Sequence, residues 1–261
     1  MDLDLVRGPL SEVRAVVFDT DGVLLDSARV HASAWKEAFD AFLQAAGPPG
    51  DTPAVPFRPF SADDYRLRVD GKSRLDGAAA FLASRGIELP AGMPDDPPGD
   101  RTVAAIAARK EELLVDRLRT HGVEVWPGTP RLLRALARSE IPCAAVSASR
   151  HARELLTTAG LMGLLGTVVD GGEAALLHLP GKPDPALFLE AASRLGVPPE
   201  RSAVVEDALA GVEAGRRGGF RPVVGVDRTA GPISSSDLRA HGADLVVRDL
   251  AELLDGTPEE D

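Results

Sequence analysis

Short apolar runs alternate along the chain with longer segments whose apolar residues recur every three or four positions. The short runs are rich in β-branched residues and apolar on both faces, which is typical of strands buried in a parallel sheet. They cover residues 14–19, 141–147, 166–170, 202–207, 222–227 and 243–249. Helical patterns lie between them at residues 129–139, 150–160, 184–196 and 208–218. This alternation predicts an α/β fold with a doubly wound parallel sheet.

Residues 28–124 break the alternation, because they contain no convincing strand pattern. Helical patterns recur there at residues 28–46, 74–86 and 101–122. Loops rich in Pro and Gly separate them at residues 47–60 and 90–99. We therefore expect an all-helical domain over residues 28–124, inserted into a sheet domain formed by residues 1–27 and 125–261.

Composition and charge narrow the possible functions. The chain has 261 residues, of which 44% are hydrophobic and only 4% aromatic, so its core is expected to consist mainly of Ala, Val and Leu. The formal net charge of −11 argues against binding of nucleic acid, which needs a basic face. An acidic protein can still carry a locally positive site for a phosphorylated substrate.

The N-terminal residues lack the basic and apolar regions of a signal peptide, and no run of about 18 apolar residues is present. We therefore expect a cytoplasmic protein that does not bind membranes. Separately, we expect a monomer. Cys143 is the only cysteine and lies in an apolar run, which favours a buried thiol.

Polar side chains gather at the carboxyl ends of the predicted strands, where open parallel sheets hold their ligands. They are Asp19, Asp21, Ser147, Glu206 and Asp207, with Lys182 in a nearby loop. On an extended chain, residues two apart lie on the same face. Asp19 and Asp21 are therefore expected on one face, about 6.5–7 Å apart along the chain. One carboxylate can attack phosphorus and the other can exchange a proton with the leaving or attacking oxygen. Gly22 allows a sharp turn after them.

The charges of these residues predict a bound cation. Two like charges about 4 Å apart repel by about 4 kcal/mol at an effective dielectric near 20. Lys182 offsets only one of the four acids, so a hard divalent cation held by carboxylates, Mg²⁺, is expected. It would also shield a phosphate from Asp19. Ser147 can donate a hydrogen bond to a phosphate oxygen.

Each of these residues also has a simpler interpretation. Asp207 can cap the following helix, and Ser147 or Ser149 can cap the helix at 150–160. Lys182 can be a solvated surface lysine, and Asp-x-Asp-Gly is a common turn sequence. Their joint occurrence at several strand ends favours a site over these separate roles.

The sequence resembles the haloacid dehalogenase superfamily in four motifs. They are DTDGV at residues 19–23, Ser147, GKPDP at 181–185 and VVEDALAGVEAG at 204–215. The resemblance implies a Rossmann-like core, Mg²⁺, an aspartyl-phosphate intermediate and a helical cap domain. It implies that Asp19 is the nucleophile and Asp21 the general acid and base. It implies Mg²⁺ ligands at Asp19, Asp21 (carbonyl), Glu206 and Asp207, and phosphate-binding residues at Ser147, Ala148 and Lys182. A cis Lys182–Pro183 bond is also expected.

The insertion resembles the cap of β-phosphoglucomutases. The resemblance lies in the loop Gly71, Lys72, Ser73 and Arg74, and in His31, Trp35 and Lys110. A mutase must hold a bisphosphate, so it needs a second phosphate site, which the planar fork of Arg74 suits. Ser149 and Arg150 can assist from the sheet domain. Alternatively, Arg74 pairs with Asp70 or Asp76, His31 packs or caps its helix, and Trp35 belongs to the core.

Two functions follow from this resemblance, both on a small phosphorylated sugar. The first is a β-phosphoglucomutase that interconverts β-glucose 1-phosphate and glucose 6-phosphate. The second is a phosphatase for a small phosphosugar or related metabolite. This alternative remains because His151 stands where the mutases commonly have an Asn. A receiver domain would be about half this length, and a hydrolytic dehalogenase would not need Asp21, Glu206 and Asp207 together.

Overall fold

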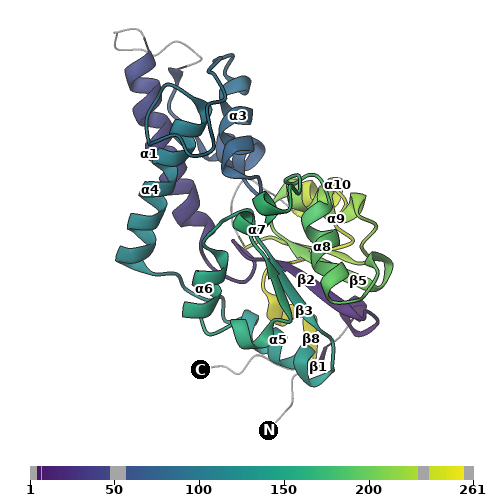
Figure 1. Ribbon diagram of the computed structural model, residues 1–261. Helices are drawn as coiled ribbons and strands as arrows, with labels where there is room; N and C mark the ends of the chain where they lie inside the picture. Colours follow the sequence, from purple (N-terminus) through teal and green to yellow (C-terminus); the bar gives the residue numbers. More distant parts are fainter. Residues whose placement is uncertain (1–4, 7, 48–56, 229–234, 256–261) are drawn as a thin grey trace. The chain divides into compact units, whose positions relative to one another are not determined.

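The computed structural model describes residues 5–6, 8–47, 57–228 and 235–255. The chain divides into two compact units, Met1–Asp26 with Val123–Asp261, and Ser27–Gly122. The first unit contains a six-stranded sheet (Figure 1). Its strands are β2 (Ala15–Asp19), β3 (Cys143–Val146), β4 (Thr167–Val169), β5 (Ser202–Glu206), β6 (Val223–Val226) and β7 (Leu245–Val247).

All neighbouring strands of this sheet are parallel, in the order β4-β3-β2-β5-β6-β7. The six predicted strands and the α/β fold class are therefore confirmed. After β2, the chain adds β3 and β4 on one side of it and then β5, β6 and β7 on the other. The point at which the strand order reverses therefore lies between β2 and β5. In addition, β1 (Leu5–Val6) and β8 (Leu254–Asp255) form a two-stranded antiparallel ribbon that the sequence patterns did not predict.

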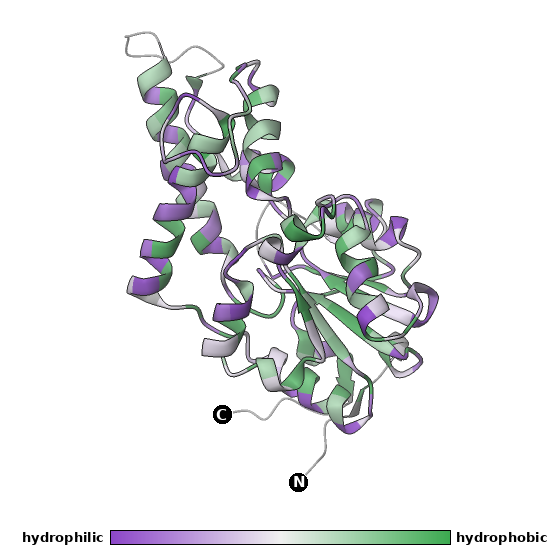
Figure 2. Ribbon diagram, in the orientation of Figure 1, coloured by the Kyte–Doolittle hydropathy of each residue, from purple (hydrophilic) through white to green (hydrophobic). Residues whose placement is uncertain are grey.

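Helices cover both faces of the sheet. They are α5 (Gly128–Arg138), α6 (Ala152–Thr158), α7 (Gly171–Leu176), α8 (Ala186–Arg194), α9 (Leu209–Arg217) and α10 (Ser235–Ala240), with short turns η1 (Gly8–Ser11), η4 (Met162–Leu164), η5 (Pro199–Arg201) and η6 (Leu250–Leu253). Two hydrophobic cores result. Val16 and Phe18 of β2 belong to the core that includes residues of α5 and α6, and Val17 belongs to the core that includes residues of α8 and α9. Figure 2 shows the apolar strands between these helices. The sheet is thus buried on both sides, as its doubly apolar strands require.

The second unit is helical. It consists of α1 (Ala28–Ala46), α2 (Ala62–Asp64), the π-helical turn η3 (Tyr65–Val69), α3 (Arg74–Ser84) and α4 (Val103–His121). The predicted helices 28–46, 74–86 and 101–122 correspond to α1, α3 and α4. Most of the Pro-rich segment 47–60 lies outside the described residues, while 90–99 is a loop.

The aromatic residues concentrate in this helical unit. Phe39 is fully buried, with its ring centroid 4.2 Å from that of Phe81, 4.8 Å from Trp35 and 5.0 Å from Phe60. The expected core of Ala, Val and Leu is found in the sheet unit, but the helical unit is built around aromatic rings. A small unit buries more apolar area per residue with such side chains.

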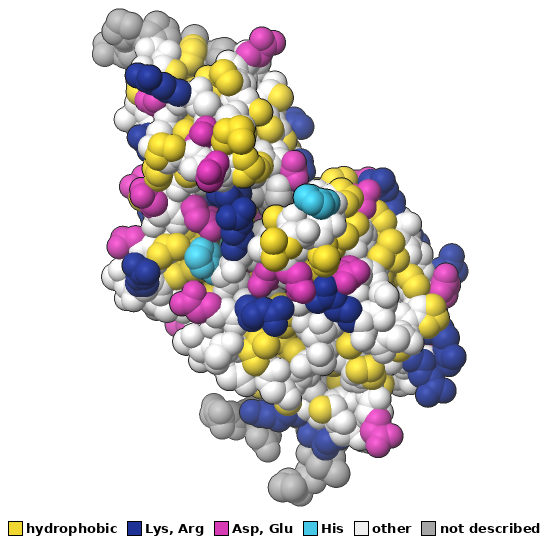
Figure 3. All heavy atoms as spheres, in the orientation of Figure 1, with side chains coloured by type: hydrophobic (Ala, Val, Ile, Leu, Met, Phe, Trp, Pro, Cys, Tyr) yellow, Lys and Arg dark blue, Asp and Glu magenta, His cyan; other side chains and the backbone are white. Residues whose placement is uncertain are grey.

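Within the described residues, no helix is both long and apolar enough to cross a membrane. On the face drawn in Figure 3, Lys and Arg side chains are interspersed with Asp and Glu. Cys143 is buried as predicted, and burial raises the pKa of its thiol to about 12.

Replacing Phe39 by Ala should remove the centre of the aromatic core. The expected loss in the free energy of unfolding is about 3–5 kcal/mol, because the cavity adds to the lost transfer energy. Urea unfolding followed by circular dichroism measures it. Met93→Ala is the control, since Met93 is 65% exposed and should cost less than about 0.5 kcal/mol. Equal losses in the two variants would refute an aromatic core as the main support of this unit.

Candidate active site

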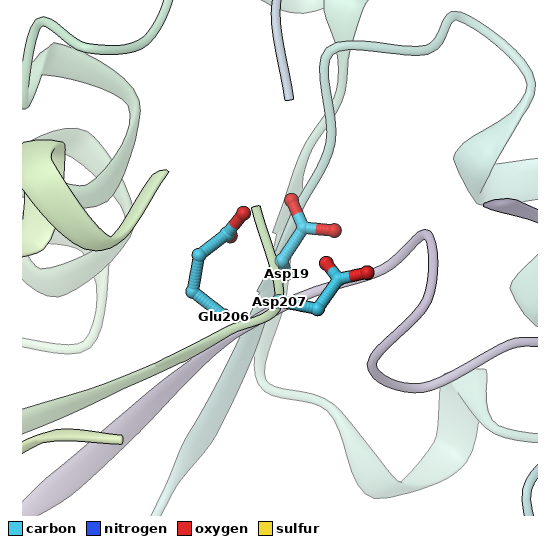
Figure 4. A group of neighbouring side chains, drawn as sticks. All are labelled: Asp19, Glu206 and Asp207. Carbon is cyan, nitrogen blue, oxygen red and sulfur yellow. The ribbon is translucent and has the colours of Figure 1, made fainter. Parts of the chain in front are cut away.

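Three carboxylates meet at the switch point of the sheet. Asp19 is the last residue of β2 and Glu206 the last of the adjacent β5, and Asp207 follows it. Because side chains alternate along a strand, Asp19 lies on the same face as Val17, and Glu206 on the same face as Val204. Both valines belong to the core with α8 and α9. Carboxylate oxygens of the three acids lie within 4.8 Å of one another (Figure 4).

Lys182 lies between two of these acids. Its Nζ donates to Asp19 Oδ1 and, at 2.9 Å, to Glu206 Oε2. The lysine is 3% exposed, and its ammonium lies 4.8 Å from the ring centroid of Phe188 on α8. The loop that carries it leads into α8 through a cis Lys182–Pro183 bond, as expected. Lys182 is therefore not a solvated surface lysine.

The acids and the lysine shift one another's pKa. Burial raises the pKa of Asp19 well above its usual range; Glu206 and Asp21 add to this rise, and Lys182 opposes it. Burial lowers the pKa of Lys182, but Asp19 and Glu206 outweigh this effect and hold it above the ordinary value. The lysine stays charged at neutral pH, and one positive charge does not neutralise the acids around it.

The loop after β2 carries Asp21 and turns sharply. The Thr20 carbonyl accepts hydrogen bonds from the amides of Leu24 and Leu25, at 3.1 and 3.0 Å. Asp21 Oδ2 accepts a hydrogen bond of 2.8 Å from Ser147 Oγ, which follows β3. The predicted residues Asp19, Asp21, Ser147 and Lys182 are thus brought together at adjacent strand ends.

Glycines allow this close packing. Gly22 has a φ of +85°, and a Cβ there would lie 2.0 Å from Asp207 Oδ2. A Cβ on Gly211 of α9 would lie 2.1 Å from Glu206 Cδ. Any side chain at either position would therefore displace a carboxylate of the cluster.

The donor set fits a hard divalent cation. Asp19, Glu206 and Asp207 offer only oxygen, the ligand type that Mg²⁺ prefers. At 4.8 Å, the upper limit of their separations, two such carboxylates would repel by about 3 kcal/mol at an effective dielectric near 20. A cation among them would relieve this repulsion, so the residues present fit Mg²⁺.

Three residues predicted for the helical unit lie together within it. Lys110 Nζ lies 3.3 Å from His31 Nδ1 and 5.5 Å from the ring centroid of Trp35. Lys110 is 3% exposed, and Trp35 is buried and stacks on Phe39. Trp35 therefore belongs to the aromatic core, whereas His31 and Lys110 form a polar pair beside it.

The loop Gly71–Arg74 joins η3 to α3. Gly71 has a φ of +72°, and Ser73 caps α3 by accepting a hydrogen bond from the Asp76 amide. Lys72 is half-buried. Arg74 begins α3, and its Nη2 donates to the Pro94 carbonyl at 3.1 Å. The loop is therefore ordered by its own turn and cap.

Residues after β3 form a second polar turn. Ser147 Oγ accepts a hydrogen bond of 2.9 Å from the Ser149 amide, and Ser149 Oγ accepts one of 3.3 Å from the His151 amide. Arg150 is exposed. A Cβ on Gly171 would lie 2.2 Å from the Ala148 carbonyl oxygen, so α7 packs tightly against this turn.

Two simpler interpretations of these residues are not supported. Helix α9 has Ala208 at its cap position, so Asp207 does not occupy that position. Helix α6 begins after His151, without a side-chain cap. Neither Ser147 nor Ser149 occupies the cap position there.

The family model of haloacid dehalogenase-like hydrolases matches residues 13–219. The chain belongs to this family. The protein is an enzyme with phosphotransferase or phosphatase activity. The predicted family resemblance is confirmed.

Several relatives resemble this member of the family over nearly its whole length. It is 47% identical over 249 residues to a β-phosphoglucomutase of Mycobacterium tuberculosis, covering 95% of this chain and 94% of the relative. It is 30% identical to a β-phosphoglucomutase of Bacillus subtilis, covering 92% of each. The crystal structure of a β-phosphoglucomutase from Clostridium difficile has the same fold, with a TM-score of 0.70 at 22% identity, covering 92% of this chain and 93% of that one.

Two residues near the site, Arg228 and Asp249, were not among those predicted from the sequence. Arg228 follows β6, and its side chain reaches the carbonyls of Gly22 and Val23. Asp249 follows β7 and pairs with Arg228 at 2.7 Å. Both stand at the ends of predicted strands, so the criterion that selected Asp19 and Glu206 would also have selected them.

Replacing Lys182 by Met should leave Asp19 and Glu206 buried without their shared cation. We expect the free energy of unfolding at pH 7 without Mg²⁺ to fall by about 3–5 kcal/mol, the usual cost of breaking a buried ion pair. Because the pKa of Lys182 is raised on folding, its contribution is fully present below about pH 10 and is lost at higher pH. Urea unfolding measures the change.

Lys36→Met is the matched control. Lys36 also pairs with an aspartate, Asp40 at 2.8 Å, but its side chain is 55% exposed. The expected loss there is below about 1 kcal/mol. If both lysine variants lost the same stability, the buried bridge of Lys182 would contribute nothing beyond a surface pair.

Proposed function

We propose that the protein is a Mg²⁺-dependent β-phosphoglucomutase that works through an aspartyl-phosphate. The observation that carries this proposal is the cluster of Asp19, Glu206 and Asp207, in which Lys182 donates to Asp19 and Glu206. Ser147 donates to Asp21 in the loop that follows Asp19. The mutase relative at 47% identity supports the choice of reaction. The proposed substrate is a small phosphorylated sugar.

Asp19 has the position expected of the nucleophile. It is held rigidly at the end of a buried strand, and its carboxylate attacks the phosphorus of β-glucose 1,6-bisphosphate or of another phosphosugar. The bond from phosphorus to the sugar oxygen breaks, and Asp21 gives that oxygen a proton. In the second half-reaction Asp21 takes the proton from the attacking sugar hydroxyl, and the phosphoryl group leaves Asp19.

The other groups stabilise charge in this scheme. Lys182 and Ser147 donate to the oxygens of the transferring phosphoryl group. Mg²⁺ held by Asp19, Glu206, Asp207 and the Asp21 carbonyl would reduce the repulsion between the phosphate and Asp19.

A phosphatase is the second candidate. His151 stands where the mutases often have an Asn, and Arg150 beside it is exposed. If these residues do not bind the distal phosphate, water replaces the sugar hydroxyl as the attacking group. The chemistry of Asp19 and Asp21 is otherwise the same.

One assay separates these candidates. Purified protein is mixed with Mg²⁺, β-glucose 1-phosphate and a trace of β-glucose 1,6-bisphosphate. Formation of glucose 6-phosphate supports the mutase, and release of inorganic phosphate alone supports the phosphatase. No reaction with these or with p-nitrophenyl phosphate would reject the phosphoryl-transfer mechanism.

Substitution of the two aspartates should affect turnover differently. Asp19→Asn should abolish it, because an amide does not attack phosphorus. Asp21→Asn should lower kcat by about 10²–10⁴-fold, because the leaving oxygen is no longer protonated. Asp95→Asn, at an exposed position of the helical unit, serves as the control. Full activity in either active-site variant would contradict the assigned roles.

Arg74→Ala tests the proposed second phosphate site. The variant should lose far more of its kcat/KM for mutase turnover than for hydrolysis of p-nitrophenyl phosphate, which has no second phosphate. Arg101→Ala, an exposed arginine of the same unit, should change neither rate. Equal losses for both reactions in Arg74→Ala would exclude a distal phosphate site at Arg74.

A further inference from the structure

Arg228 links the loop after β2 to the ends of two other strands. It is the second residue after β6, and its side chain is only 6% exposed. Its Nε donates to the Gly22 carbonyl at 3.0 Å and its Nη2 to the Val23 carbonyl at 2.9 Å. One guanidinium therefore holds two successive carbonyls of the loop that carries Asp21.

The guanidinium is itself fixed on two sides. Its Nη1 donates to Asp249 Oδ2 at 2.7 Å, and its Cζ lies 4.3 Å from the ring centroid of Trp126. Asp249 Oδ1 in turn accepts a hydrogen bond of 2.8 Å from the Ala251 amide at the start of η6. A planar group with this many partners has one orientation, so it can fix the loop in one conformation.

The position of the loop matters for the acidic cluster. Gly22 packs so closely on Asp207 that a Cβ would lie 2.0 Å from Oδ2. The carbonyl that Arg228 binds belongs to this same glycine. Displacement of Gly22 would therefore shift Asp21 on one side and release Asp207 on the other.

We propose that Arg228 is a positioning residue that holds the Asp21–Val23 loop, and through it the Asp207 carboxylate, in the geometry needed for Mg²⁺ binding and proton transfer. This inference rests on the proposed phosphoryl-transfer function. Arg228 touches neither the reacting atoms nor the three clustered carboxylates by any hydrogen bond among the described contacts. Its role is to fix the backbone of the loop at Gly22 and Val23.

Charge supports this role. Burial lowers the pKa of Arg228, and Asp249, Asp207 and Asp26 oppose that effect. Arginine remains protonated at neutral pH in any case. The chain thus has a second buried cation, besides Lys182, that interacts electrostatically with an acid of the cluster, Asp207.

Two substitutions and a rescue test the proposal. Arg228→Lys keeps the charge, but an ammonium cannot reproduce the planar fork that binds both carbonyls and Asp249. Arg228→Ala removes the group altogether and leaves room for free guanidinium. Mg²⁺ affinity is measured by calorimetry on the protein without substrate, and kcat and KM are measured with p-nitrophenyl phosphate.

In both variants we expect Mg²⁺ affinity and kcat to fall by about 10–100-fold, the usual effect of removing a group that orients metal ligands, with a smaller change in KM. Millimolar guanidinium should restore part of both quantities in Arg228→Ala and nothing in Arg228→Lys. Arg216→Ala is the control. Arg216 also pairs with an aspartate, Asp244 at 3.1 Å, but at the amino ends of the strands.

The outcomes separate this inference from the function on which it rests. If the unsubstituted protein binds no Mg²⁺ and hydrolyses no phosphomonoester, the proposed function fails. If it does both, and a folded Arg228→Lys binds Mg²⁺ and turns over normally, the positioning role is overturned. Should Arg228→Ala not fold, Arg228→Lys decides alone, because it preserves the charge and most of the aliphatic side chain.

Discussion

The interaction on which the rest of the site depends is the buried bridge from Lys182 to Asp19 and Glu206. Two carboxylates that end adjacent strands, facing the same helices, would repel each other strongly in a dry interior. The ammonium between them makes that arrangement tolerable and keeps both acids oriented. It also explains why the loop before α8 must reach the carboxyl edge of the sheet.

The sheet supplies the rigidity that this bridge needs. Its strands are buried on both faces, so the strand ends have little freedom to move. Close packing then leaves space only for glycine at residues 22 and 211, where a side chain would collide with Asp207 or Glu206. Arg228 extends the same principle to the loop, since it replaces water at two backbone carbonyls with fixed donors.

The helical unit is stabilised differently. Its core consists of stacked and tilted aromatic rings rather than the aliphatic side chains that dominate the sheet unit. A buried Lys110 lies beside this core, near His31 and over the ring of Trp35. The unit therefore combines a compact aromatic interior with a small set of polar groups that are held in place by packing.

The sequence by itself determined the strands, most of the helices and the set of acids at the strand ends, because apolar periodicity and the position of polar residues after each run are local properties. It did not reveal the β1–β8 ribbon, whose two-residue strands carry no pattern of their own. Only the tertiary structure decided that Lys182 is buried between Asp19 and Glu206, that Trp35 belongs to a core, and that Arg228 reaches the loop 205 to 206 residues earlier in the chain. The contacts of Lys182 and Arg228 join segments far apart in sequence. They depend on how the strands are ordered in the sheet and how the helices pack, which no local pattern encodes.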